Sequence, residues 1–284
     1  MRRDILLTTA LVLMSALLFS LAAAQSTATP APTPTPTPRP ADILVPEVIA
    51  DYPHDAGAYT QGLLLHDGLF YESAGQYGES TLRQVAPETG EVLRQVDVPA
   101  EYFAEGLALV EDRLIQITWR EQTAFVYDLE TFEPVGMFEY EGEGWGLCYD
   151  GQQLFMSDGT DTLTIRDPQT FEATDERLIS LEGRPVSEWA FRGRPLSLLN
   201  ELECVDDWIY ANIWYSDLIF QIDKNSGEVK AVIFAGDLLT DEERSALADD
   251  SVLNGIAYDP QKEVFYLTGK RWPRLFEVRF VTPD

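Results

Sequence analysis

Hydrophobic and polar residues alternate with a period of two along most of the chain after residue 41, and short turns separate the alternating segments. This pattern is typical of half-buried β-strands joined as hairpins. Five segments share one form, in which an apolar strand and a strand rich in Tyr, Phe, Ile and Leu flank a short polar turn. They begin at Gln61, Glu105, Trp145, Asn200 and Asn254. The same hairpin is therefore expected five times in the chain.

Two further alternating strands follow each of the first four hairpins, around a turn in which Thr or Ser precedes Gly or Phe. These Thr and Ser residues, at positions 89, 131, 170 and 226, lie 42, 39 and 56 residues apart. Repeats of about 40 to 50 residues with four strands each indicate a β-propeller. We therefore expect an all-β fold, a five-bladed β-propeller, in a catalytic domain spanning residues 42–284.

The fifth repeat is incomplete, because the chain ends after a third strand, "RLFEVRF". The segment "ADILVPEVIADY" at the start of the domain can supply the missing outer strand, so we predict that an N-terminal strand closes the last blade. The long interval also locates an insertion at residues 183–200, and a second one at 236–254 contains the helix-forming stretch "TDEERSALA". Both insertions lead into an inner strand from the same side.

The first 41 residues have a different character from the repeats. Residues 1–25 carry two arginines, then a long apolar run, then a row of alanines, which is the order of a secretory signal peptide. Residues 26–41 are a Pro/Thr-rich linker. We expect a secreted, periplasmic or cell-surface protein. The alternative is an uncleaved membrane anchor, because the apolar run is long for a signal.

Composition narrows the kinds of partner and of metal site. The chain has 48 acidic and 20 basic residues, a net charge of −28, and no Lys/Arg cluster, which argues against a nucleic-acid partner. His54 and His66 are the only histidines, which argues strongly against a His-rich catalytic zinc site. Cys148 and Cys204 each lie within an apolar strand segment, and we expect free buried thiols, with a disulfide as the alternative in an exported protein.

The repeat places chemically diverse residues at equivalent positions. The inner strands of a propeller line a central channel, so the five leading residues should lie together at its mouth. The far ends of the second strands should form a second ring beside them, of Ser73, Trp119, Asp158, Trp214 and Lys270. Taken singly, each tryptophan fits packing between blades and each polar residue fits a turn or the surface. Their convergence favours a functional site.

Several motifs in order between about residue 50 and 280 resemble a known family: "YTQGLL", "FAEGLAL", "LIQITWRE", "GWGL", "LNELE", "IYANIWYSD", "VLNGIAYDP" and "TGKRWP". They are similar to the plant and bacterial type of glutaminyl-peptide cyclotransferase, or glutaminyl cyclase. The resemblance implies a five-bladed propeller that converts the N-terminal glutamine of peptides or proteins to pyroglutamate and releases ammonia. It also implies that neither a catalytic metal nor a cofactor is needed.

The resemblance assigns roles to seven residues. Its catalytic set falls on Glu105, Lys270 and Gln61, and its substrate-binding set on Trp119, Trp145, Asn200 and Trp214. Glu105 would carry protons from the attacking amine to the departing ammonia, while Gln61, Lys270 and the Trp145 N–H are candidates to stabilise the oxyanion. Tyr59 and Ala104 depart from the family's expected Phe and Gly beside the site.

We expect the protein to be a monomer. Two other functions remain open at this point. A non-enzymatic propeller would bind peptide or sugar ligands at the same mouth, using the tryptophans without an active carboxylate. A propeller hydrolase or lactonase would hold a metal, with Glu105, Asn200 and Asn254 as ligands, but the tryptophans and Gln61 fit that role poorly.

Overall fold

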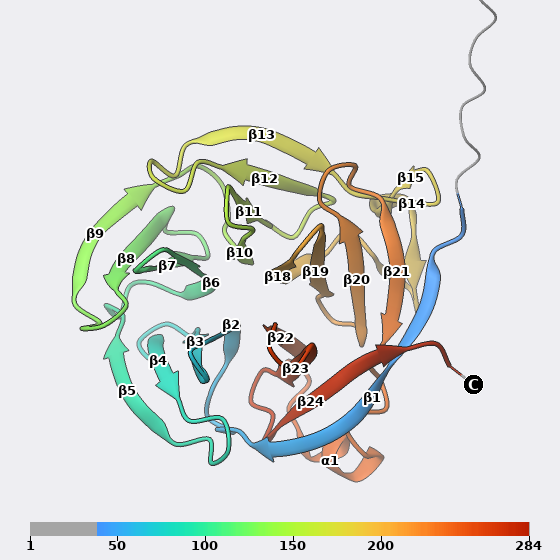
Figure 1. Ribbon diagram of the computed structural model, residues 1–284, viewed down its shortest axis with the longest axis horizontal. Helices are drawn as coiled ribbons and strands as arrows, with labels where there is room; N and C mark the ends of the chain where they lie inside the picture. Colours follow the sequence, from blue (N-terminus) through green and yellow to red (C-terminus); the bar gives the residue numbers. More distant parts are fainter. Residues whose placement is uncertain (1–38, 284) are drawn as a thin grey trace, which may run out of the picture. The chain divides into compact units, whose positions relative to one another are not determined.

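The computed structural model describes residues 39–283. The expected signal segment and nearly all of the expected linker lie outside the described residues. Five four-stranded blades surround a central channel, each with its first strand innermost, which confirms the predicted propeller (Figure 1). The first three blades are β2 (Thr60–His66), β3 (Leu69–Ala74), β4 (Thr81–Val85) and β5 (Val92–Asp97); β6 (Ala104–Val110), β7 (Arg113–Thr118), β8 (Thr123–Asp128) and β9 (Pro134–Glu139); and β10 (Leu147–Tyr149), β11 (Leu154–Met156), β12 (Thr162–Arg166) and β13 (Ala173–Leu178).

The last two blades join in one sheet. They consist of β18 (Leu199–Val205), β19 (Trp208–Ile213), β20 (Leu218–Asp223) and β21 (Val229–Phe234), followed by β22 (Leu253–Asp259), β23 (Val264–Gly269), β24 (Arg274–Val281) and β1 (Asp42–Pro53). β1 pairs antiparallel with β24 along most of its length, which confirms closure by an N-terminal strand. Its first three residues also pair in parallel with β21, so β1 links both blades (Figure 1).

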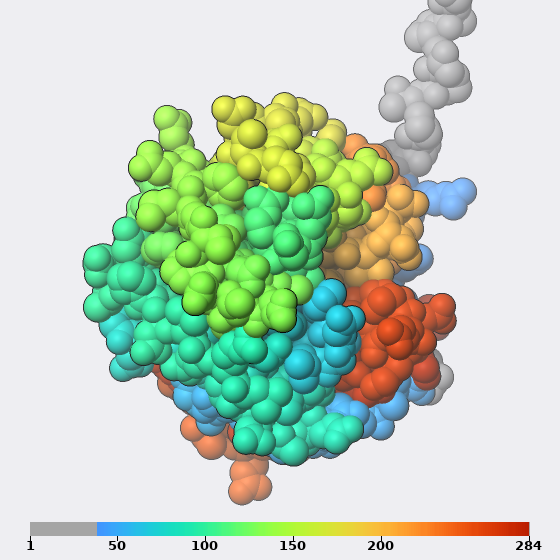
Figure 2. Space-filling model, turned by 60° about the vertical axis from the view of Figure 1, so that its left-hand side comes forward, coloured from blue at the N-terminus to red at the C-terminus, as the bar shows by residue number. Residues whose placement is uncertain are grey.

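Apolar side chains fill the five interfaces between neighbouring blades, one buried cluster at each. At the first interface, Leu64 and Leu82 pack against Leu107 and Leu114. The outermost strands β5, β9 and β13 are exposed at most positions. Figure 2 shows the flank of the ring on which β5 and β9 lie. The repeated alternation therefore buries apolar side chains between neighbouring blades rather than in one central core.

Glycines bring the inner strands close together around the channel. A Cβ on Gly106 would lie 2.5 Å from the backbone nitrogen of Leu147, and one on Gly146 would lie 2.0 Å from the Asn200 carbonyl oxygen. Glu201 stands at the corresponding position of β18. Its carboxylate accepts backbone N–H bonds from β2 and β22, at 3.3 and 2.9 Å, and thus crosses the channel. The glycines after Glu105 and Trp145 are therefore required by the close approach of neighbouring inner strands.

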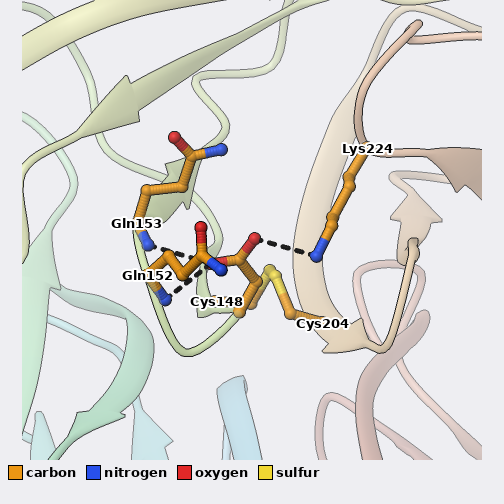
Figure 3. Close-up of a disulfide and its surroundings, with 6 residues drawn as sticks. Cys148, Gln152, Gln153, Cys204 and Lys224 are labelled. Atoms are coloured by element: carbon orange, nitrogen blue, oxygen red, sulfur yellow. Dashed lines mark hydrogen bonds and ion pairs between the residues drawn. A yellow bond between two sulfur atoms is a disulfide. The ribbon is translucent and has the colours of Figure 1, made fainter.

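The two cysteines are not free, and our expectation of free thiols was wrong. Cys148 on β10 and Cys204 on β18 form a disulfide, with their Cα atoms 5.5 Å apart (Figure 3). The strands are the innermost ones of adjacent blades, so two residues 56 positions apart in sequence meet beside the channel. An ion pair between Asp150 and Lys224, 3.1 Å long, lies next to the bond. Sequence spacing carries no information about such a contact between blades.

Both predicted insertions add structure outside the blades. The first contains the hairpins β14 (Ser180–Leu181)–β15 (Arg184–Pro185) and β16 (Ala190–Phe191)–β17 (Arg194–Pro195), with the 3₁₀-helix η1 (Val186–Glu188) between them. The second contains α1 (Asp241–Ala246), which begins with a capping box between Thr240 and Glu243. Among the described residues there is no helix of the length and apolarity that crossing a membrane would take.

Candidate active site

A cavity of about 140 Å³ lies where the inner strands begin. Its walls come from all five blades and include the seven residues that the sequence predicted. The lining residues are Tyr59, Gln61, Gln76, Phe103, Glu105, Trp119, Trp145, Asn200, Trp214 and Lys270. A dry cavity of about 150 Å³ holds one benzene molecule. The volume therefore suits one amino-acid side chain rather than a longer segment.

Backbone irregularities aim the first ring of side chains into the cavity. Gln61, Glu105 and Asn200 are each the second residue of an inner strand, and the strand register shifts at each of them. A β-bulge of this kind redirects a side chain that regular pleating would send elsewhere. Trp145 differs, because it lies two residues before its strand and is held by an N–H bond to the Ser157 carbonyl.

The second ring follows the ends of the second strands, with one correction. Trp119, Trp214 and Lys270 each come directly after such a strand, and the backbone N–H of each donates to a carbonyl at the start of the same hairpin. In the first blade this bond belongs to Gly75, whereas Ser73 lies two residues earlier and accepts a hydrogen bond from Gln116. The expected place of Ser73 was wrong. Neither it nor Asp158 lines the cavity.

A hydrogen-bonded chain links three of the predicted residues. The Gln61 Oε1 accepts from Lys270 Nζ at 2.6 Å and from Asn254 Nδ2 at 3.3 Å. The amide is thereby fixed, and its Nε2 donates to Glu105 Oε1 at 2.9 Å. The other Glu105 oxygen has no hydrogen-bond partner in the described part of the chain. Gln61 thus orients the carboxylate and leaves one oxygen for a ligand.

Burial shifts the pKa values of the two charged groups in this hydrogen-bonded chain, Glu105 and Lys270. Glu105 is 5% exposed, and burial raises its pKa well above the usual range, although the Lys270 ammonium opposes the shift; Glu143 and Glu121 raise it further. Burial lowers the pKa of Lys270 to about 8, against the opposing effects of Glu105 and Asp250. A carboxyl and an ammonium that both titrate nearer neutrality suit proton transfer.

Aromatic rings form most of the remaining wall. Trp145 and Trp214 meet edge to face with centroids 5.1 Å apart, and Phe103 meets Trp119 at 5.7 Å. The Lys270 ammonium lies 4.8 Å from the Tyr59 ring centroid, within the range of a cation–π contact. These contacts hold the rings rigidly around the carboxylate.

Two buried polar atoms in the wall have no partner among residues 39–283. They are the indole nitrogen of Trp214 and the side-chain oxygen of Asn200. A buried donor or acceptor without a partner costs about 1–3 kcal/mol, so such atoms mark places where a ligand completes the bonding. One donor and one acceptor match the oxygen and the NH₂ group of a carboxamide.

Glu143 is a site residue that the sequence did not reveal. Its Oε2 accepts from both the Trp119 Nε1 (2.8 Å) and the Trp145 Nε1 (3.1 Å). Its other oxygen accepts from Arg120, whose guanidinium lies 3.6 Å over the Trp119 ring. The Trp145 N–H is therefore engaged, which corrects its expected role as an oxyanion donor. Glu143 lies two residues before the leading residue Trp145, and only this position in the repeat distinguishes it from Glu141 in the run "EGEGWG".

Glu143→Ala is expected to lower kcat/KM about tenfold for any substrate of the cavity, mainly through KM. Loss of the acceptor frees both indoles to rotate, at a cost typical of a hydrogen bond to a charged group. Steady-state kinetics against Glu141→Ala, an exposed neighbour without a hydrogen bond to another described residue, provide the measurement. Glu143→Gln, which keeps an acceptor oxygen, should restore part of the loss. Equal kinetics for the two alanine variants would contradict a positioning role.

Three further lining residues were not predicted as site residues: Tyr59, Phe103 and Gln76. Tyr59 and Phe103 each lie two residues before a leading residue, and their carbonyls accept the hairpin bonds described above. The five-fold alignment carried this signal, because the position recurs in each repeat. Gln76 follows the first hairpin with a φ of 140°, a backbone conformation that sequence reasoning does not detect.

Groups of three or more His, Cys, Asp or Glu side chains with a geometry suited to a metal ion do not occur within residues 39–283. Asn200 and Glu105 line the cavity, but Asn254 directs its amide nitrogen to the Thr60 carbonyl and to Gln61. The ligand set expected for a metal hydrolase is therefore not assembled.

Comparison with known proteins agrees with the geometry. The profile of the family described as glutamine cyclotransferase matches residues 13–280. A glutaminyl-peptide cyclotransferase of Arabidopsis thaliana is 41% identical over 238 residues, which cover 82% of this chain and 70% of that protein. The crystal structure of Myxococcus xanthus glutaminyl cyclase is 38% identical and matches with a TM-score of 0.76, covering 86% of this chain and 100% of that one.

Proposed function

This chain belongs to the glutamine cyclotransferase family, and we propose that it cyclises N-terminal glutamine by metal-independent acid–base catalysis centred on Glu105. It is a glutaminyl-peptide cyclotransferase, and its substrates are peptides with N-terminal glutamine. The observation that supports the proposed mechanism best is the Glu105 carboxylate itself. It is buried, oriented by Gln61 through one oxygen, and has its other oxygen without a partner in the described residues.

The cavity walls favour the curled conformer that cyclisation requires. The α-amine must approach the δ-carbon of its own side chain, which a chain in solution rarely achieves. We place the carboxamide between the Trp214 N–H, which donates to its oxygen, and the Asn200 oxygen, which accepts from its NH₂ group. Trp119 and Trp145, held by Glu143, enclose the aliphatic part of the side chain.

Glu105 carries the proton between the two nitrogens. The α-amine is largely protonated near neutral pH, with an unperturbed pKa of about 7.7–8.0. The ammonium first loses a proton to solvent. As the free amine forms its bond to the δ-carbon, the Glu105 carboxylate takes a proton from the attacking nitrogen, and the carbonyl oxygen becomes an oxyanion. The Trp214 N–H and the Lys270 ammonium stabilise that charge. Glu105 then protonates the departing nitrogen, the C–N bond breaks, and ammonia leaves with pyroglutamate as the product.

Ammonia release from a peptide with N-terminal glutamine, measured with the purified protein, tests the function directly. Release of one ammonia per peptide, together with the mass loss of ammonia, is the expected result. A protein that binds the peptide without releasing ammonia would instead be a non-enzymatic propeller. The rate should persist after treatment with a chelator, and loss of activity that zinc or calcium restores would overturn the metal-independent mechanism.

Lys270→Met is expected to move the acidic limb of the kcat/KM profile to higher pH, by about one unit or more. The Lys270 ammonium lowers the pKa of Glu105, so its removal raises that pKa. The Glu105 carboxylate, which is the catalytic base, then forms only at higher pH. Glu143 and Glu121 remain and act in the same direction. Kinetics from about pH 5 to about pH 9 on one peptide provide the test. Lys270→Arg keeps the charge and should leave the limb in place, whereas an unmoved limb in Lys270→Met would exclude this coupling.

We also propose that the protein acts outside the cytoplasm, as a monomer. The apolar segment in residues 1–25 and the Pro/Thr-rich linker support export. The disulfide adds support, because such bonds persist mainly in oxidising compartments. Fractionation of cells that express the full chain, followed by mass determination of the released protein in solution, tests both statements.

A further inference from the structure

The two insertions meet in a groove next to the active cavity. The first insertion contributes Arg194, and the second contributes Arg244 and the turn from Leu247 to Val252. Together with Tyr215 and Ser216, they line a groove of about 270 Å³. Nothing in the reaction described above uses this groove. The groove lies there because the insertions lead into the inner strands β18 and β22 from the same side of the ring.

The walls of the groove continue into the walls of the cavity. On one side, Tyr215 follows Trp214, and their ring centroids lie 4.2 Å apart. On the other side, the Val252 carbonyl accepts the backbone N–H of Lys270 at 2.9 Å. Trp214 and Lys270 line the cavity, whereas Tyr215 and Val252 line the groove. A bound peptide that leaves the cavity between these residues therefore enters the groove.

The charges of the groove are partly neutralised within it. Arg244 forms an ion pair with Asp217 at 3.0 Å and also donates to the Gly236 carbonyl. Arg194 makes no ion pair in the described part of the chain, and its guanidinium lies 4.6 Å from the Tyr215 ring centroid. This cation–π contact holds a guanidinium with free donors beside the groove. Asp249 is the other charged lining residue outside any ion pair among the described residues.

We propose that the groove binds the residues that follow the N-terminal glutamine of a peptide substrate, and that Arg194 favours a carboxylate among them. This inference rests on the proposed function. The cavity has room for one side chain, so the rest of the peptide must leave through its mouth. A chain with a net charge of −28 repels acidic peptides in general, and a fixed guanidinium on an aromatic ring offsets that repulsion locally.

The test uses tetrapeptide amides with N-terminal glutamine, in which one glutamate replaces alanine at the second, third or fourth position. At low salt, the wild-type protein should show a KM about threefold lower for the best glutamate peptide than for the all-alanine peptide, as expected for an exposed ion pair. Arg194→Ala should abolish this difference. Its kcat, and its kinetics on glutamine amide, which ends before the groove, should match those of the wild-type protein.

Arg192→Ala is the matched control, because Arg192 lies in the same hairpin and stacks on Phe191 rather than lining the groove. It removes the same charge and should keep the preference. Loss of the preference in both variants would assign it to net charge and overturn the inference. A preference for lysine at these positions would also overturn the inference, because Asp249 rather than Arg194 would then be the group that selects the peptide. If the protein cyclises glutamine amide but shows no preference among the tetrapeptides, the role of the groove is refuted and the proposed function stands. If it fails to cyclise glutamine amide, the proposed function itself is refuted.

Discussion

Glu105→Gln is expected to abolish cyclisation while the propeller stays folded. The substitution keeps the shape of the side chain but removes the group that accepts the proton of the α-amine. General acid–base groups contribute about 10²–10⁴-fold, and this residue serves both proton transfers, so kcat should fall by at least about 10³-fold. The measurement is ammonia release from a peptide with N-terminal glutamine, together with the thermal midpoint of the variant.

Glu203→Gln is the matched control for this variant. Glu203 is another carboxyl on an inner strand, and burial raises its pKa to about 8. The hydrogen bond that it accepts from the Tyr258 N–H opposes this shift. It does not line the cavity. This variant should keep its activity, which separates loss of a proton acceptor from loss of any carboxyl with a raised pKa. A Glu105→Gln protein that released ammonia at a rate near that of the wild-type protein would refute the assignment of the base.

Stability should respond in the direction opposite to activity. The buried Glu105 carboxyl has a raised pKa, so ionising it in the folded protein costs free energy as the pH rises through that value. The amide of Glu105→Gln does not ionise, and its side-chain oxygen can still accept the hydrogen bond from Gln61 Nε2. A catalytic site often lowers the stability of the folded protein in this way, because the groups that react are kept in an environment unfavourable to their charge.

The fold could be predicted from the sequence because one pattern is repeated. Alternation gave the strands, the interval between turns gave the blades, and the incomplete fifth repeat gave the closure by β1. The same repeat brought the seven predicted residues to one mouth, since equivalent positions of symmetric blades must converge. The glycine after Glu105 has the same origin, because the neighbouring inner strand leaves no room for a Cβ there.

Contacts across blades could not be predicted in this way. Glu143 acts on Trp119 from the next blade, and the sequence contains no pairing rule for that distance. The Ser73 position was wrong by two residues because the length of a strand depends on its hydrogen bonds and not on its alternation. The disulfide is the clearest case, since Cys148 and Cys204 lie on equivalent strands of adjacent blades, and only the geometry of the ring brings them together.

Removal of the disulfide is expected to lower stability far more than activity. A bond that closes a loop of 56 residues restricts the unfolded chain by about 4 kcal/mol in the loop-entropy account. For a domain of this size that corresponds to a fall of about 10 °C in the thermal midpoint. Cys204 lies four residues beyond Asn200 along β18, about 13 Å further from the cavity, so the site geometry should persist.

Cys148→Ala/Cys204→Ala, compared with the wild-type protein with and without a reductant, provides the measurement by thermal melting and by ammonia release at 25 °C. The double variant should melt lower than the oxidised protein by about 10 °C and close to the reduced protein, since both lack the same constraint. Its kcat/KM should stay within about twofold of the wild-type value, because the chain from Lys270 through Gln61 to Glu105 involves neither β10 nor the lower part of β18. Equal midpoints for the oxidised protein and the double variant would show that packing of β10 against β18, and not the covalent bond, holds these two blades together.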